Sequence, residues 1–133
     1  MTSLQGKFMN IPRVVVFAIA LLFLRSCVSA ITDSPMGSEL SAAQLALRYS
    51  IDYLLDAAVV SGVFVRLALV QARSLYLHVF SVLVLHELLG ALLLFAIGDT
   101  NHQSPLWMLD WAVTVLSVLL GTELGRRWRT DSR

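Results

Sequence analysis

The stretch Leu75–Ile97, LYLHVFSVLVLHELLGALLLFAI, is almost entirely apolar over its twenty-three residues. As an α-helix it rises about 34 Å, enough to cross a hydrocarbon core about 30 Å thick. Over the whole chain 57% of the residues are hydrophobic and only 14% are charged, whereas soluble domains carry about 25% charged residues. Because a backbone in lipid must satisfy its own hydrogen bonds, so long an apolar run predicts a membrane-spanning helix.

Three further apolar segments surround this one and are separated by short polar breaks. They run from about Ile11 to Ala30, from Tyr49 to Val70, and from Leu106 to about Leu124. The sequence therefore predicts an all-α fold, a polytopic transmembrane bundle of four helices. In this division of the chain, residues 1–30 hold the first segment, residues 31–48 an extracytoplasmic loop, residues 49–124 a three-helix unit and residues 125–133 a basic cytoplasmic tail.

The turn QARS at residues 71–74 is too short for anything but a tight connection. We therefore expect the second and third helices to be antiparallel neighbours.

The first segment permits two interpretations. Its uninterrupted apolar part, Val14–Leu24, rises only about 16 Å. With Lys7 and Arg13 before it and the small residues Val28–Ala30 after it, the segment has the features of a cleaved secretory signal peptide, which would leave three helices. Alternatively, Arg25 extends its side chain to the membrane interface and the segment stays as a first spanning helix.

Basic residues gather on one side of the predicted bundle. Lys7 and Arg13 precede the first segment, Arg73 lies in the tight turn, and four arginines follow the last segment. The positive-inside rule then places this side, with the C-terminus, in the cytoplasm. Short polar loops fit a bacterial inner membrane, and an organelle membrane fits them equally well. The aromatic residues expected to anchor the helices at the two membrane interfaces are Tyr49, Tyr53, Trp107 and Trp111 on one side and Tyr76 and Trp128 on the other.

Ionisable side chains inside the spans are the candidate functional residues, because each costs about 2.5–3.5 kcal/mol at the bilayer centre. Counted from the tight turn, Arg66 lies about 7 Å deep and Glu87 about 18 Å deep. We expect Arg66 to pair with Glu87, and Asp56 to accept a hydrogen bond from His86. The predicted polar cluster of these four residues is either a proton, ion or small-ligand site or a mutually satisfied group that determines helix register.

Other kinds of chemistry find little support in the sequence. A single cysteine, Cys27, excludes an intrachain disulfide and a cysteine metal cluster. His86 and Glu87 lack the second histidine of a zinc protease helix, and His78 and His86 on one helix are badly placed to bind a single haem, although a haem shared by two chains stays open. We expect no catalytic residue, metal, cofactor or nucleic-acid partner. The expected partners are the lipid bilayer and other membrane chains or a second copy.

Small residues four apart, such as Ser61 after Ala57, Gly62 after Ala58 and Gly121 after Ser117, allow helices to approach closely. These pairs favour a compact bundle or a homo-oligomer. The functional hypothesis is a non-enzymatic accessory or structural subunit of a membrane complex, or a self-associating bundle. The alternative is a small channel or proton-coupled transporter that uses Asp56, Arg66, His86 and Glu87.

The stretch NHQSPLWMLDWAVTVLSVLL, residues 101–120, carries His102, Ser104, Pro105 and Leu106 just before the last span. In these positions the chain resembles the phosphate-starvation-inducible PsiE family of small bacterial inner-membrane proteins. The resemblance implies four helices, a basic C-terminus and a role connected with phosphate limitation.

Overall fold

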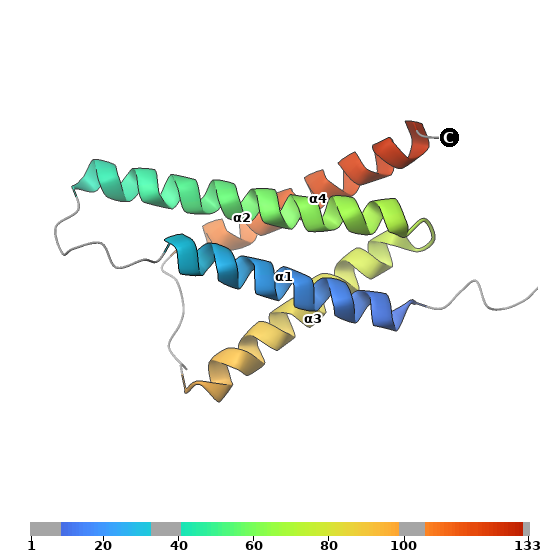
Figure 1. The fold of residues 1–133 in the computed structure, drawn as a ribbon, viewed down its shortest axis with the longest axis horizontal. Coiled ribbons are helices and arrows are strands. Elements are labelled where there is room, and N and C mark those ends of the chain that lie inside the picture. The colour runs from blue at the N-terminus through green and yellow to red at the C-terminus, as the bar shows by residue number, and fades with distance from the viewer. Residues whose placement is uncertain (1–8, 33–40, 99–105, 132–133) are drawn as a thin grey trace, which may run out of the picture.

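The structure is a computed structural model that describes residues 9–32, 41–98 and 106–131. These residues form four α-helices joined end to end (Figure 1): α1 Ile11–Thr32, α2 Ala42–Val70, α3 Leu75–Ala96 and α4 Trp107–Asp131. Each helix is long and apolar enough to cross a membrane. The predicted all-α bundle of four transmembrane helices is confirmed, and the chain is an integral membrane protein.

Helix α2 begins at Ala42 rather than at the expected Tyr49. The reason is a reciprocal cap at its start, where the Ser41 hydroxyl accepts a hydrogen bond from the Gln44 amide and the Gln44 side chain accepts one from the Ser41 amide. Two otherwise unsatisfied backbone groups are thereby paired. The predicted loop 31–48 is therefore helical at both of its borders, and residues 33–40 lie outside the described residues.

Helix α4 continues to Asp131 instead of ending near Leu124, so most of the predicted basic tail is helical. Glu123 binds Arg126 at 2.8 Å and Arg127 at 3.0 Å, three and four residues further along the same helix. Pairs at this spacing lie on one helix face and stabilise it.

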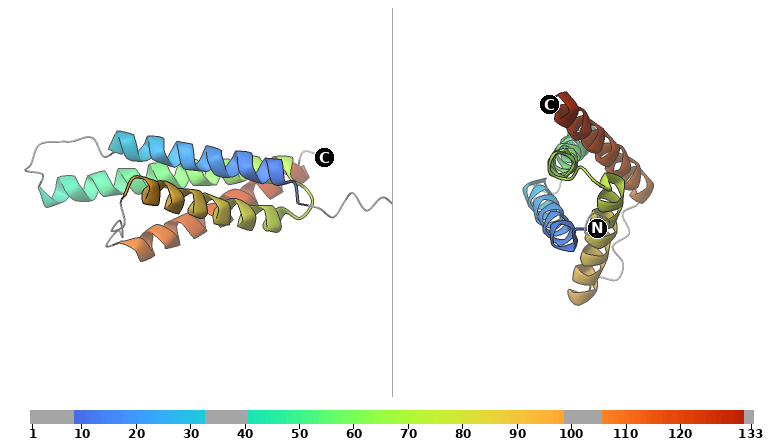
Figure 2. Two further views of the ribbon diagram at one scale, coloured as in Figure 1. Left: turned by 90° about the horizontal axis from the view of Figure 1, so that it is seen from below. Right: turned by 90° about the vertical axis from the view of Figure 1, so that its right-hand side faces the viewer.

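The packing order of the helices differs from the expected one. Helix α1 lies against both α2 and α3, while α4 packs along α2 (Figure 2). Helices α2 and α3, expected to be neighbours, touch only slightly and diverge from their turn in Figure 1. Ser74, in the left-handed conformation at φ 53°, directs α3 away from α2, and α1 occupies the space between them. A tight turn holds only the adjoining helix ends together.

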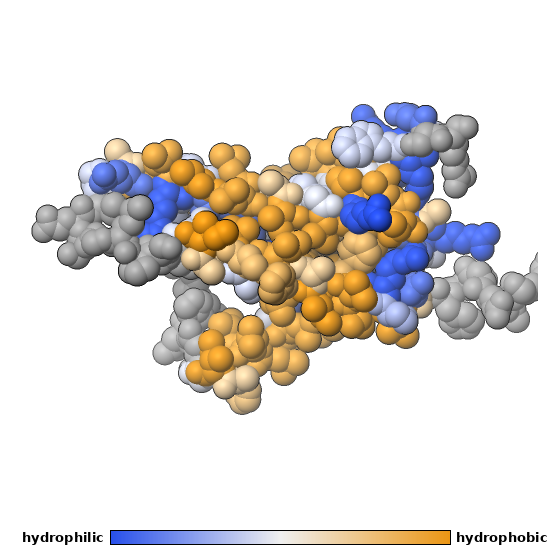
Figure 3. Space-filling view, viewed as in Figure 1, coloured by the Kyte–Doolittle hydropathy of each residue, from blue (hydrophilic) through white to orange (hydrophobic). Residues whose placement is uncertain are grey.

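The core of the bundle is a thin layer of apolar side chains where α1, α2 and α3 meet. Its fully buried members are Ala18, Leu21, Val60, Phe64, Leu67, Ala68 and Val82. Most other apolar side chains face outward, and Figure 3 shows them over the middle of the molecule with hydrophilic residues gathered at its two ends. This distribution is that of a helical bundle whose surroundings are lipid rather than water.

Helices α2 and α4 approach each other closely through small residues. Gly121 packs directly on the backbone of Ser61, and Gly125 lies beside the backbone of Val65. The Ser61 hydroxyl donates a hydrogen bond of 3.1 Å to the Ser117 carbonyl across the same interface. The predicted close contact by small residues is therefore present, with Gly121 and Gly125 as its tightest points.

Two arginines from other helices bind the carboxyl end of α2. Arg13 of α1 donates to the Val70 carbonyl at 3.0 Å, and Arg129 of α4 donates to the Gln71 carbonyl at 2.7 Å. These carbonyls lack partners within the helix, and the helix dipole makes them attractive to cations. We call this the arginine end of the bundle, and the opposite end, which carries Asp52 and Asp110, the acidic end. Lys7 and Arg133 lie outside the described residues.

Five of the six predicted interface aromatics are about half exposed, as anchors at a membrane interface need to be: Tyr49, Tyr76, Trp107, Trp111 and Trp128. Tyr53 instead turns inward and hydrogen-bonds Asp110.

The contact at Gly121 predicts that Gly121→Ala destabilises the bundle by about 1–3 kcal/mol, because the added methyl group overlaps the Ser61 backbone and forces α2 and α4 apart. Thermal unfolding in detergent, followed by circular dichroism, measures the effect. Gly90→Ala in α3 is the matched control, since a methyl group there meets nothing within 4 Å. An equal melting temperature for the two variants would contradict the assigned contact.

Candidate functional site

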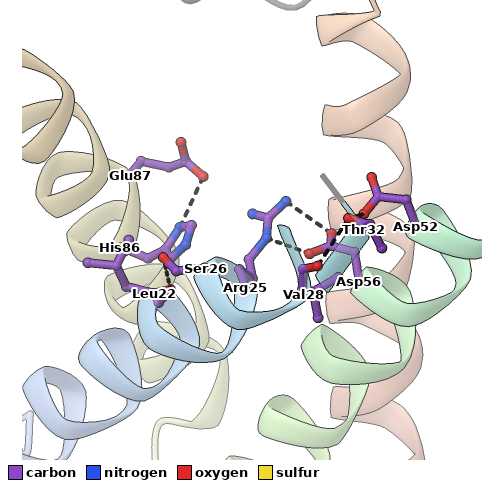
Figure 4. A network of polar contacts seen from close by, with 9 residues as sticks. All are labelled: Leu22, Arg25, Ser26, Val28, Thr32, Asp52, Asp56, His86 and Glu87. Carbon is purple, nitrogen blue, oxygen red and sulfur yellow. Dashed lines mark hydrogen bonds and ion pairs between the residues drawn. The ribbon is translucent and has the colours of Figure 1, made fainter. Parts of the chain in front are cut away.

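An ion pair between Arg25 of α1 and Asp56 of α2 lies at the centre of the candidate site (Figure 4). The Arg25 Nε donates to Asp56 Oδ1 at 2.8 Å and Nη2 donates to Oδ2 at 3.0 Å, so the guanidinium binds both carboxylate oxygens in a bidentate pair. The two side chains are 25% and 16% exposed. Such two-pronged, charge-assisted bonds are among the strongest in proteins, and this one joins two spanning helices.

Two further carboxylates hydrogen-bond across helices on the acidic side of this pair. Asp52 of α2 accepts a 2.7 Å hydrogen bond from the Thr32 hydroxyl of α1. Asp110 of α4 accepts a 2.6 Å hydrogen bond from the Tyr53 hydroxyl of α2. Polar contacts thus connect α2 to both α1 and α4 at this end.

Helix α3 contributes His86 and Glu87, which lie on the other side of Arg25 from Asp56 in Figure 4. The His86 Nδ1 stands 3.2 Å from a Glu87 carboxylate oxygen, and with a proton on Nδ1 the ring donates to it. His86 is buried, whereas the Glu87 side chain is 43% exposed. His86 therefore satisfies only part of the hydrogen-bonding capacity of the Glu87 carboxylate.

These groups surround two cavities. The larger, about 380 Å³, extends from Asp52 near the acidic end to Asp56 and His86 deeper in the bundle. The smaller, about 120 Å³, lies among Glu87 of α3, Asp110, Trp111 and Thr114 of α4, and Arg25, which borders both cavities. Of the described residues, four carboxylates and one guanidinium line the two spaces: Asp52, Asp56, Asp110, Glu87 and Arg25. When all five are ionised and His86 is neutral, four negative charges and one positive charge leave a net charge of −3. This balance favours protons and small cations over anions.

A packed apolar layer separates these cavities from the arginine end. The layer consists of three fully buried side chains, Leu21, Val60 and Val82. Each lies four residues, or one helical turn, closer to the arginine end than the polar residue of its own helix, which is Arg25, Asp56 or His86 respectively. The polar region therefore occupies one half of the bundle.

The structure brings three of the four predicted cluster residues together, namely Asp56, His86 and Glu87. The prediction for Arg66 is wrong: its side chain is exposed and lies on the outer face of α1 and α2 beside Gly62 and Phe17. The expected ion pair with Glu87 is therefore not formed, and Asp56 binds Arg25 rather than His86. The reason is the helix order, because α3 packs on α1 and the Arg66 face of α2 points away from it.

Sequence reasoning did not assign Arg25 as the partner of Asp56. A signal was present, because Arg25 is fourteen residues from the start of α1 and Asp56 is fourteen residues from the end of α2. Both counts give a depth of about 21 Å from the arginine end. Two opposite charges that share one depth on adjacent antiparallel helices are natural partners. Asp52, Tyr53 and Asp110 also belong to the site although none was placed in the predicted cluster.

Within the described ranges, no three His, Cys, Asp or Glu side chains stand close enough to hold a metal ion. Comparison of the chain with models of known protein families, with curated proteins and with solved structures finds no match. Of the four residues that carry the PsiE resemblance, three lie outside the described residues, namely His102, Ser104 and Pro105.

The Arg25–Asp56 pair predicts that Asp56→Asn lowers the free energy of unfolding by about 3 kcal/mol, because the guanidinium keeps its charge and loses its counter-charge in a largely buried place. Thermal unfolding in detergent measures the change. The double variant Arg25→Met, Asp56→Leu should recover most of the loss, since it removes both charges.

The matched control is Glu123→Gln, which breaks ion pairs on the exposed surface of α4. Exposed pairs contribute little to stability, so this variant should melt near the wild-type temperature. Equal melting of Asp56→Asn and Glu123→Gln would show that the central pair contributes nothing.

Proposed function

We propose that the protein is a non-enzymatic subunit of a membrane assembly and that another transmembrane chain, or a second copy, docks where α3 and α4 are not packed together. The observation that carries this proposal is the half-exposed carboxylate of Glu87, halfway along a spanning helix.

A carboxylate in this position is costly without a partner. Glu87 is twelve residues into α3, about 18 Å from the arginine end, where a charge costs about 2.5–3.5 kcal/mol. The only hydrogen bond that it makes to a described residue is with the adjacent His86. A donor on another chain would satisfy the remaining acceptor positions and remove much of this cost.

The space beside Glu87 suits such a contact. Helix α3 packs on α1, helix α4 packs on α2, and no extensive contact joins the described parts of α3 and α4. Leu88, next to Glu87 on α3, is exposed, and Trp111 of α4, which lines the small cavity with Glu87, is about half exposed. Lipid also accepts apolar side chains, so these two residues alone do not argue for a partner. The carboxylate beside them does.

The arginine end is proposed to face the cytoplasm, because the positive-inside rule applies to Arg13, Arg73 and the arginines of α4. A bacterial inner membrane is the proposed location, with an organelle membrane as the alternative. The PsiE resemblance adds a proposed connection with phosphate limitation.

A small channel or proton-coupled transporter is the second candidate, and the acidic cavity favours it. Protons or cations entering from the acidic end would meet Asp52, then Asp56, then His86 and Glu87. In this candidate Arg25 takes the place that the sequence hypothesis assigned to Arg66. Transport would require the buried layer at Leu21, Val60 and Val82 to open.

The subunit proposal predicts that gentle detergent extraction yields the chain together with a partner, or with a second copy, in fixed stoichiometry. Glu87→Gln should weaken this association about tenfold, because a charged hydrogen bond across the interface is replaced by a neutral one. Native mass spectrometry of the extracted complex measures both quantities. Glu123→Gln, at a partly exposed glutamate near the arginine end of α4, is the matched control and should leave the association unchanged. Recovery of the wild-type chain only as a monomer would contradict the proposal.

The transport candidate predicts pH-dependent proton or cation flux in proteoliposomes, recorded with a pH-sensitive dye inside the vesicles. Glu87→Gln should abolish the pH dependence, because the amide cannot take up and release a proton. Flux that persists unchanged in the variant, or its absence in the wild type, would count against this candidate.

A further inference from the structure

A groove lies between α1 and α2. In the end-on view of Figure 2 these two helices form one side of the bundle, and α3 and α4 lie on the other. Its volume is about 350 Å³. Phe17, Ala20 and Leu24 line it from α1, and Ala58, Gly62 and Arg66 line it from α2. Apart from Arg66, every one of these side chains is apolar.

Small residues make the groove hollow. Gly62 forms part of its floor, and a side chain added at this position would meet nothing within 4 Å. The space above Gly62 therefore faces the surroundings and is filled by no described part of the chain. In an integral membrane protein the surroundings at this depth are lipid chains.

Arg66 lies at the arginine end of the groove, four residues before the last residue of α2. Arg13, Arg25 and Arg129 bind protein oxygens, but no described residue forms a hydrogen bond or ion pair with Arg66. None of the described residues that line the groove is a carboxylate either. An exposed guanidinium about 6 Å below the end of its helix can extend to the lipid headgroups.

We propose that this groove binds one anionic phospholipid of the leaflet at the arginine end, with its phosphate on Arg66 and an acyl chain along α1 and α2 toward Leu24. A guanidinium presents a planar pair of donors that matches two phosphate oxygens. Basic pockets between spanning helices are known to hold anionic headgroups. From Arg66 to Ala58 the groove runs about 12 Å, most of the roughly 15 Å of hydrocarbon in one leaflet.

The charge of the groove selects this occupant over a partner helix. A helix docked here would have to bring its own carboxylate to the level of the Arg66 guanidinium, whereas every anionic lipid in the leaflet already carries its phosphate at that depth. The lipid also supplies a flexible chain that fits a narrow space floored by Ala58 and Gly62.

The test is native mass spectrometry of the full chain after reconstitution into vesicles of equal parts phosphatidylglycerol and phosphatidylcholine and extraction in mild detergent. The wild type should retain one phosphatidylglycerol, preferred about tenfold over phosphatidylcholine, because the choline cation of phosphatidylcholine offsets the attraction between its phosphate and Arg66. Arg66→Gln should abolish the preference. Gly62→Leu, which fills the groove and leaves Arg66 in place, should abolish retention of both lipids.

Arg73→Gln is the matched control, because Arg73 is an exposed arginine at the same end but outside the groove. It should retain phosphatidylglycerol like the wild type, and circular dichroism should show unchanged helicity for all three variants. Equal retention of the two lipids by the wild type, or equal loss in Arg66→Gln and Arg73→Gln, would overturn the proposal. Displacement of the lipid by inorganic phosphate would also overturn the proposal. So would a wild-type dimer that becomes a monomer in Arg66→Gln, because the groove would then hold a second copy of the chain.

Discussion

The ion pair between Arg25 and Asp56 is the interaction on which the arrangement of this bundle depends. It joins α1 and α2 at equal depth, and a shift of either helix by one turn, about 5.4 Å, would separate the charges inside the hydrocarbon. The pair therefore determines the register of the two helices. With that register in place, Leu21 and Val60 lie at the same level in the buried apolar layer, one turn from the ion pair toward the arginine end. The polar cavity extends from the ion pair toward the acidic end.

The positions of α3 and α4 depend on how closely each can approach α1 and α2. Helix α4 comes close to α2 because Gly121 and Gly125 let its backbone rest on that of α2. Helix α3 leaves its turn at Ser74 in a direction that brings it onto α1 instead. The two outer helices thus bind different partners, and the side between them stays open beside Glu87. Arg13 and Arg129 bind the carboxyl end of α2 from both neighbours and hold the arginine end together.

The two polar features of the surface face different ways and call for different ligands. Glu87 presents an acceptor between α3 and α4, next to a cavity region with excess negative charge. Arg66 presents a donor on the far side, at the end of an apolar groove. The two proposals therefore assign different faces of the bundle to their ligands, the face at Glu87 to a chain or cation and the face at Arg66 to an anionic lipid.

By itself the sequence determined the environment, the positions of the apolar segments and the side of the bundle on which the arginines gather, because these follow from apolar length and charge position along the chain. Leu75–Ala96 was predicted almost to the residue, since its hydropathy admits only a spanning helix. The helix ends were harder to predict from the sequence, because the cap at Ser41 and the ion pairs of Glu123 extend α2 and α4 beyond their apolar segments. Only the tertiary structure decided which charges pair. The sequence pointed to Arg66 as the partner of Glu87 and placed Arg25 at the membrane interface, whereas Arg25 binds Asp56. The difference depends on α3 packing on α1, a matter of surface shape that the order of residues along the chain does not display.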